Sequence, residues 1–194
     1  MKMMKKTLFI LAGALIAVTA MAQSHREVTL DEGWQFSRDN TTWQQVTVPH
    51  DWAISGPFDK KWDLQVVAIK ENGENVATEK SGRSGALPWI GKGYYKTTFT
   101  VPVTYKHVQL VFDGAMADAH VYVNGQLAGH WAYGYNAFIV DASPYIHTNG
   151  LANDLEVRLE NLEESNRWYP GGGIYRPVKL VMTQGFNSPA LERI

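Results

Sequence analysis

The sequence predicts an all-β protein built as an antiparallel β-sandwich, and three observations indicate this fold class. Several short stretches alternate apolar and polar residues with a period of two, as strands with one buried face do. From residue 23 onward, no stretch sustains a helical period. Pairs that contain glycine or proline separate the alternating stretches and are typical of turns. About 170 residues would suffice for one domain of ordinary size.

The first 22 residues are predicted to be a signal peptide. Lys2, Lys5 and Lys6 precede an apolar run over residues 7–19, and Ala20-Met21-Ala22 fits the small-x-small cleavage rule. We therefore expect an exported protein, periplasmic or extracellular, that begins at Gln23. The apolar run is too short for a membrane span and no later stretch is long enough, so no span is expected after cleavage. An uncleaved anchor is the alternative.

Charge and cysteine content narrow the possible partners and the source of stability. Removing residues 1–22 takes away three lysines and no acid, so the net charge changes from -1 to -4. No basic patch exists, and nucleic acid is therefore not expected as a partner. The chain also contains no cysteine, although export would permit disulfides. Stability must then come from a packed core.

The strands can be placed in chain order. The first are expected at 28–30, at 34–36 and between Trp43 and Val48. A long irregular region, 53–92, follows and contains one strand-like piece at 64–69. Regular alternation then predicts strands at 95–101, 108–112, 119–123, 155–159 and 178–182. Asn124-Gly125 predicts a type I′ hairpin after the third of these.

The irregular region is longer than most loops in compact domains, and such loops are usually functional or disordered. Trp62 and Trp89 near its ends argue against disorder, because disordered segments contain few aromatic residues. Five of the seven tryptophans are predicted to fall in loops: Trp52, Trp62, Trp89, Trp131 and Trp168. Rings gathered on sandwich loops suit a saccharide, but they also suit an interface with another domain.

The segment from Asn166 to Arg176 is the most unusual in the chain. Three glycines follow Pro170 and lie between two aromatic pairs, and such a run is predicted to form a loop with close backbone approach. At least one of these glycines is expected at positive φ. Rings beside a guanidinium can bind a sugar or a planar ligand, but aromatics that plug the end of a sandwich are commoner. We expect Arg176 to bond loop carbonyls; the rival interpretation makes it a direct sugar ligand.

Motifs for other chemistry are not found in the sequence. His50-Asp51, at a strand end, could supply polar ligands, although such a pair more often caps a turn. The histidines show no metal-binding spacing, the triple glycine lacks the rest of a phosphate-binding loop, and no nucleophile elbow occurs. Nothing in the spacing pairs two carboxylates for glycoside hydrolysis. We therefore expect no metal, no cofactor and no catalytic residue in this chain.

Four ordered motifs resemble the N-terminal sugar-binding domain of glycoside hydrolase family 2. They are Val48-Pro49-His50-Asp51-Trp52, Gly93-Tyr94-Tyr95-Lys96, Val121-Tyr122-Val123-Asn124-Gly125 and the run from Arg167 to Arg176. Together they cover about residues 28 to 182. The stretches 62–68 and 78–83 look like the secreted bacterial beta-galactosidase branch, although beta-glucuronidases and beta-mannosidases share the domain.

The resemblance implies a jelly-roll β-sandwich followed by an immunoglobulin-like domain and a TIM barrel that bears the catalytic glutamates. It implies a retaining beta-galactosidase as the whole enzyme and a beta-galactoside-type saccharide as its ligand. The chain would then comprise a signal peptide (1–22), the sugar-binding domain (23–184) and a truncated tail (185–194), and would be inactive alone. A free-standing carbohydrate-binding module is the alternative.

The resemblance also assigns site residues. The candidate substrate-binding residues are Asp51, Trp52, Trp89, Arg167, Trp168, Tyr169 and Arg176. Some beta-galactosidases carry an aspartate, which reaches the sugar or a cation, in the loop before the final Gly-Ile-aromatic-Arg. The matching position here is Arg167, so no cation role carries over.

Overall fold

The computed structural model describes residues 25–59, 62, 64–67, 79–82, 88–162 and 171–184. The predicted signal peptide and the predicted tail from residue 185 lie outside the described residues. The candidate site residues Arg167, Trp168 and Tyr169 lie outside them as well. No helix in the described ranges is long and apolar enough to cross a membrane.

Strands make up nearly all the regular structure of these ranges. In chain order they are β1 (His25–Thr29), β2 (Trp34–Ser37), β3 (Gln44–Val46), β4 (Leu64–Val67), β5 (Glu79–Gly82), β6 (Lys92–Thr100), β7 (His107–Phe112), β8 (Ala119–Val123), β9 (Gln126–Trp131), β10 (Phe138–Asp141), β11 (Ala152–Glu160) and β12 (Val178–Thr183). A short 3-10 helix, η3 (Ser143–Tyr145), lies between β10 and β11.

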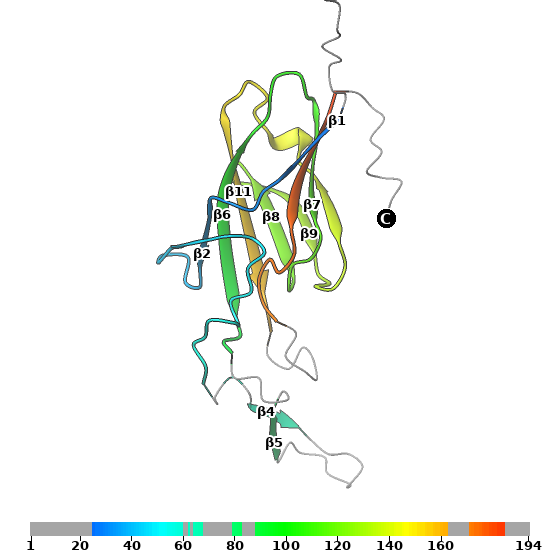
Figure 1. The fold of residues 1–194 in the computed structure, drawn as a ribbon. Coiled ribbons are helices and arrows are strands. Elements are labelled where there is room, and N and C mark those ends of the chain that lie inside the picture. Colours follow the sequence, from blue (N-terminus) through cyan, green and yellow to red (C-terminus); the bar gives the residue numbers. More distant parts are fainter. Residues whose placement is uncertain are drawn as a thin grey trace, which may run out of the picture.

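Two antiparallel sheets form a sandwich (Figure 1). The first has the strand order β1-β12-β7-β10, and the second has the order β3-β2-β6-β11-β8-β9. β11 lies inside the second sheet, between β6 and β8, and is paired with β6 from Ala152↔Thr100 to Glu160↔Lys92. β4 and β5 pair with each other. The predicted all-β sandwich is confirmed.

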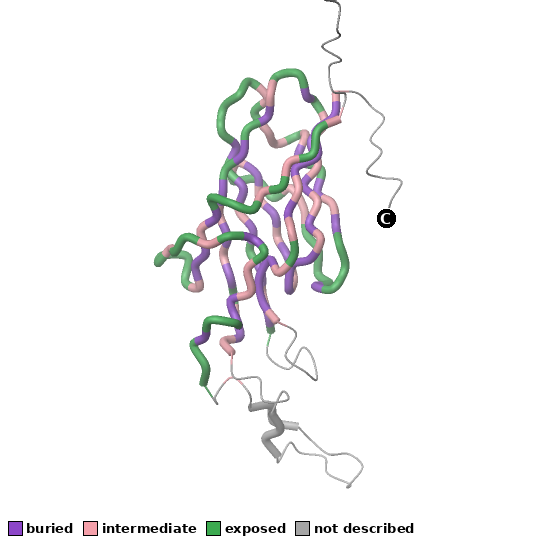
Figure 2. Tube along the Cα trace, viewed as in Figure 1, coloured by how far each residue is buried: buried purple, intermediate pink, exposed green. Residues whose placement is uncertain are grey.

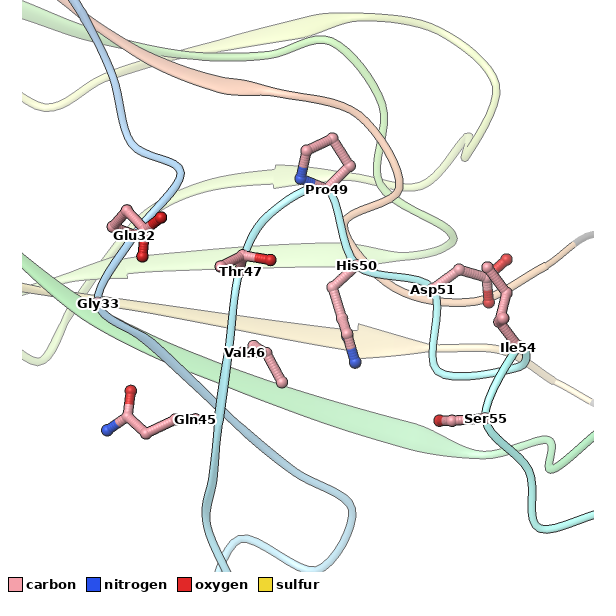
Figure 3. Close-up of a pocket in the computed structure, with 10 residues that line it drawn as sticks. All are labelled: Glu32, Gly33, Gln45, Val46, Thr47, Pro49, His50, Asp51, Ile54 and Ser55. Atoms are coloured by element: carbon pink, nitrogen blue, oxygen red, sulfur yellow. The ribbon is translucent and has the colours of Figure 1, made fainter.

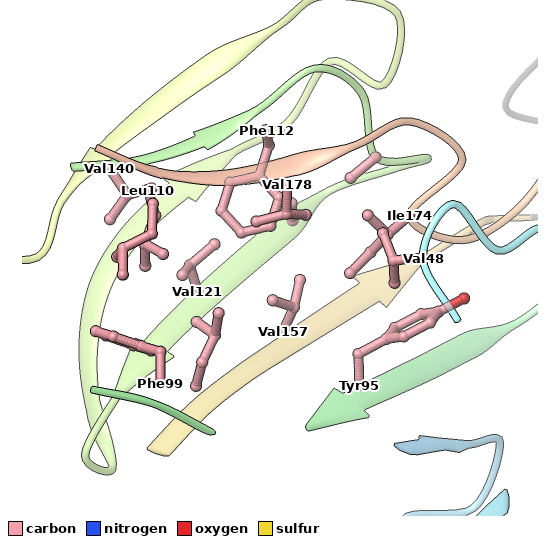
Figure 4. Packing of buried hydrophobic residues seen from close by; sticks show 14 of the residues in the cluster. Val48, Tyr95, Phe99, Leu110, Phe112, Val121, Val140, Val157, Ile174 and Val178 are labelled. Atoms are coloured by element: carbon pink, nitrogen blue, oxygen red, sulfur yellow. The ribbon is translucent and has the colours of Figure 1, made fainter. Parts of the chain in front are cut away.

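The core lies between the two sheets, where alternate residues of β6, β7, β8 and β11 meet (Figures 2 and 4). In β11, Leu155, Val157 and Leu159 are buried, whereas the residues between them reach the surface. From the facing sheet, the ring of Phe112 stacks on Phe138 with centroids 4.7 Å apart. This alternation is the one the sequence predicted, because a period of two places every second side chain on the buried face.

The hairpin between β8 and β9 has the predicted turn. Asn124 and Gly125 have φ values of 49° and 77°, and a type I′ turn requires positive φ at both central residues. One prediction for this region is wrong: Trp131 is the last residue of β9 rather than a loop residue. It pairs with Ala119 across the hairpin, and its ring stacks on Phe138 with centroids 5.9 Å apart.

Candidate functional site

Two segments that are far apart in the sequence meet at one side of the sandwich. The His50 amide donates to the Ile174 carbonyl (2.7 Å), and the Trp52 amide donates to the Gly172 carbonyl (3.1 Å). On its other side the glycine segment pairs with Met116: the amide of each residue donates to the carbonyl of the other, with the Met116 amide 2.9 Å and the Gly173 amide 3.1 Å from its acceptor. The glycine segment is therefore held between two other parts of the chain.

Each of the three glycines has a positive φ, a close contact that leaves no room for a Cβ, or both. Gly171 and Gly173 have φ values of 85° and 110°, so the prediction of positive φ in this run is confirmed. A Cβ on Gly172 would lie 2.2 Å from the indole of Trp52, and one on Gly173 would lie 2.3 Å from the His50 carbonyl oxygen. Larger residues cannot occupy this segment without moving the backbone or the core.

The Asp51 carboxylate joins the two segments. Its Oδ1 accepts hydrogen bonds from the Ala53 amide (2.8 Å) and from the Gly172 amide (3.3 Å). The first bond caps the turn after β3, which was the commoner of the two interpretations of His50-Asp51. The second bond fixes the glycine segment. Asp51 is only half-buried, so the carboxylate keeps acceptor capacity for further donors.

The surroundings of His50 disfavour its charged form. Its Nδ1 lies 2.7 Å from the hydroxyl oxygen of Tyr95, whose side chain is fully buried. Burial lowers the pKa of His50, because the imidazolium would lose its hydration; the nearby Arg38 charge lowers it further and Asp51 partly opposes the shift. Burial also raises the pKa of Tyr95 far above its ordinary value. The hydrogen bond between the two side chains positions the His50–Asp51 segment.

An open hollow of about 630 Å³ lies beside this segment (Figure 3). Pro49, His50 and Asp51 follow one another along it, and Glu32 comes from the loop before β2. The volume is typical of a small-molecule site. None of the described residues that line it is Trp, Tyr or Phe. Among its described lining residues, the hollow therefore offers hydrogen-bond partners for hydroxyl groups, and the His50 imidazole is the only aromatic ring.

The two described tryptophans among the candidates have different surroundings. Trp52 is 1% exposed, stacks on Phe36 with centroids 5.7 Å apart, and donates from Nε1 to the Trp89 carbonyl (3.2 Å). It has no free face for a saccharide, so we reassign it from ligand contact to core packing. Trp89 is half-buried, with the Trp52 ring at 5.4 Å and the Arg38 guanidinium at 5.2 Å from its ring.

Arg176 does not have the anchoring role that we expected. Its side chain is exposed, and its guanidinium lies 5.4 Å from the centroid of the Tyr175 ring. In the described part of the chain, this guanidinium makes no hydrogen bond to a loop carbonyl. The backbone makes the connection instead, because the Arg176 amide donates to the Gly114 carbonyl (3.3 Å). The predicted hydrogen bonds from the guanidinium to loop carbonyls are therefore replaced by a main-chain hydrogen bond, and the guanidinium faces solvent.

Exposed aromatics that the sequence analysis did not single out lie beside Arg176. The Tyr175 hydroxyl donates to the Gly134 carbonyl (2.7 Å), which joins the glycine segment to the loop after β9. That loop carries Tyr133 and Tyr135, whose side chains are 57% and 37% exposed and whose rings lie 5.5 Å apart. We call Tyr133, Tyr135, Tyr175 and Arg176 the tyrosine-arginine cluster. The signal in the sequence is the alternation Trp131-Ala-Tyr-Gly-Tyr, which places three aromatic residues around a single glycine.

Known proteins share this fold and much of this sequence. No protein-family model matches the chain. It is 38% identical over 144 residues to Beta-galactosidase BoGH2A of Bacteroides ovatus, an alignment that covers 73% of this chain and 15% of that protein. It is 34% identical over 158 residues to a Formosa agariphila protein named "Putative beta-glucuronidase", covering 78% of this chain and 13% of the other.

A solved structure also resembles this chain in fold and sequence. A glycosyl hydrolase family 2 member from Bacteroides cellulosilyticus superposes with a TM-score of 0.63 and 31% identity, covering 81% of this chain and 20% of that one. The chain therefore spans less than a fifth of the curated relatives described above.

Proposed function

We infer that this chain, which is homologous to the N-terminal part of family 2 glycoside hydrolases, serves as the non-catalytic sugar-binding domain of such an enzyme. The observation that carries this proposal is the meeting of two motifs of the resemblance. Residues 50–52 and 172–174 lie about 120 positions apart, yet they pair through two main-chain hydrogen bonds and the Asp51 carboxylate. The junction itself is largely buried, and it holds the half-buried His50 and Asp51 at the surface, where they are available to a ligand.

Two groups of residues that contact or follow the glycine segment supply the two kinds of contact that a sugar needs. Asp51 keeps a carboxylate oxygen for hydroxyl groups, and the tyrosine-arginine cluster provides exposed rings and a free guanidinium. The C–H faces of a pyranose are apolar and stack on such rings. We propose that Arg167, Trp168 and Tyr169, which directly precede the glycine segment in the sequence, and the half-buried Trp89 also bind the saccharide.

The proposed substrate class is a beta-galactoside cleaved with retention by a TIM barrel that this chain does not contain. The 38% identity with Beta-galactosidase BoGH2A supports the galactoside, while the Formosa relative makes a beta-glucuronide the competing ligand. An immunoglobulin-like domain would connect the two parts. In this arrangement the sandwich forms one wall of the active site and supplies neither the acid/base nor the nucleophile.

Activity and binding measurements on the isolated chain test this proposal. The purified protein should not hydrolyse nitrophenyl beta-galactoside, and hydrolysis that copurifies with it would overturn the non-catalytic role. In NMR titrations, methyl beta-galactoside should perturb the signals of Tyr133, Tyr135 and Tyr175 more than methyl beta-glucuronide does. The reverse order would reassign the substrate branch. Perturbation confined to residues far from the junction would reject the site.

We propose that the enzyme is exported, because residues 1–22 have the charge and apolar pattern of a signal peptide. N-terminal sequencing of the exported protein should begin at Gln23. An exported protein that retains Met1 would contradict cleavage. The sequence downstream of codon 194 separates the domain from a free-standing carbohydrate-binding module, because only the domain requires a barrel there.

A further inference from the structure

Two histidines face each other on the hairpin of β8 and β9. His120 and His130 are directly paired across the ladder, and their ring centroids lie 4.3 Å apart. The register of the hairpin determines this pairing. Near the turn Val123 pairs with Gln126 and Tyr122 with Leu127, but a β-bulge shifts the register so that Val121 pairs with Gly129. Without the bulge, His120 would lie opposite Gly129 instead.

Asp118 brings a carboxylate to the same place. Its backbone amide donates to the Ala132 carbonyl (3.1 Å), and its Oδ1 lies 2.6 Å from His130 Nε2. Its other oxygen, Oδ2, lies 3.9 Å from His120 Nδ1, and the same nitrogen lies 3.1 Å from the Asp118 main-chain carbonyl oxygen, so the other ring nitrogen, Nε2, is the one left for a metal ion. Asp118, His120 and His130 each have one possible metal-ligand atom that lies within 4.8 Å of those of the other two residues. These side chains are 37–46% exposed, so an ion can reach them from solvent.

We propose that Asp118, His120 and His130 form a binding site for a divalent transition metal ion of the zinc type. Zinc binds imidazole nitrogen and carboxylate oxygen at about 2.0–2.2 Å, so tetrahedral ligand atoms lie about 3.3 Å apart. The Asp118 Oδ1–His130 Nε2 distance of 2.6 Å is shorter than this spacing and the Asp118 Oδ2–His120 Nδ1 distance of 3.9 Å is longer, so the side chains would have to move apart or together to hold an ion. Two imidazoles and one carboxylate favour Zn²⁺ over Ca²⁺ or Mg²⁺, which prefer oxygen ligands. Water would complete the coordination.

Neighbouring charges are compatible with a cation at this position. Arg158 of β11 lies opposite His120 and is the nearest cation in the strand pairing. Its Nε is bound to the Glu156 carboxylate at 2.6 Å, and its guanidinium lies 4.3 Å from the Tyr122 ring centroid. The Arg158 charge is therefore partly balanced by Glu156. A bound metal would tie the edge strand β9 to β8, next to the loop that carries Tyr133 and Tyr135.

Zinc binding to the full chain, produced without an affinity tag and stripped with a chelator, tests the proposal. Isothermal titration with Zn²⁺ should show one ion per chain. His120→Ala, His130→Ala and Asp118→Asn should each weaken binding at least about tenfold. His147→Ala is the matched control, because His147 is an exposed histidine outside the cluster. Failure to bind near one equivalent, or equal weakening by the control, would overturn the proposal.

Two further readouts keep the test independent of folding defects. In the unmodified protein, Zn²⁺ should shift the ring signals of His120 and His130 and leave those of the other histidines unchanged; a shift spread over all of them would mean adventitious binding and reject the site. Zn²⁺ should also raise the thermal midpoint of the parent and of His147→Ala but not of Asp118→Asn. A rise in Asp118→Asn equal to that of the parent would contradict the carboxylate ligand.

Discussion

Replacing Gly173 by alanine should lower the free energy of unfolding for two reasons, the strain of its positive φ and the overpacking that an added Cβ causes. Its φ of 110° lies in a region that L-residues rarely adopt, and a Cβ there costs about 1–2 kcal/mol. The new Cβ would also lie 2.3 Å from the His50 carbonyl oxygen and 2.5 Å from the Tyr95 hydroxyl. Neither is the end of a flexible chain, so overpacking adds about 1–3 kcal/mol. We expect a total loss of about 2–5 kcal/mol.

Gly150→Ala is the matched control for this substitution. Gly150 has a φ of 81°, and an added Cβ there would meet nothing within 4 Å. Replacing glycine restricts the unfolded chain equally in both variants, so that contribution cancels in the comparison. Urea denaturation of the parent and the two variants should therefore give Gly173→Ala a free energy of unfolding about 1–3 kcal/mol below that of Gly150→Ala. Equal values would refute the close approach of the glycine segment to residues 50–52.

Three other predictions concern Arg176, Trp52 and His50. Arg176→Lys should leave the free energy of unfolding within about 0.5 kcal/mol of the parent while weakening saccharide binding, because the guanidinium is exposed; a large loss of stability in urea denaturation would restore the anchoring role. Trp52→Ala should cost about 3–5 kcal/mol, and Trp131→Ala should cost less because Trp131 is 39% exposed; equal costs would contradict the burial of Trp52. Burial places the pKa of His50 in the folded protein below the ordinary value of 6.5. The stability that neutral His50 contributes is therefore fully present above pH 6.5 and is lost as the pH falls through the lowered pKa. An NMR titration of the folded protein that gives a His50 midpoint above 6.5 would contradict this direction.

The fold could be predicted from the sequence because its strands obey a local rule. A period-two pattern such as Leu155, Val157 and Leu159 needs no distant partner to be recognised, and Asn124-Gly125 specifies its own turn. The glycine segment was predicted for the same reason, since three consecutive glycines indicate positive φ or close approach. The residues they approach, Trp52 and His50, lie about 120 positions away and could not be derived from spacing.

Side-chain roles were harder to predict than backbone shape. Trp52 follows a strand end, where exposure is common, but the tertiary approach of Gly93 and Gly172 buries its ring. Arg176 was expected to bond carbonyls, yet main-chain pairing with Gly114 already holds its segment. His120 and His130 are ten residues apart and have no metal-ligand spacing in sequence. A single β-bulge brings them face to face, and bulges leave little signal in one sequence.

The most direct test of the central claim is a chimera in which residues 23–184 replace the homologous segment of Beta-galactosidase BoGH2A. If this chain is the sugar-binding domain of a related enzyme, the chimera should hydrolyse nitrophenyl beta-galactoside, and Gly173→Ala within it should lower the activity. A chimera that carries the corresponding segment of the Formosa agariphila relative serves as the control for domain exchange. An inactive chimera that is folded and soluble, beside an active control, would contradict the account.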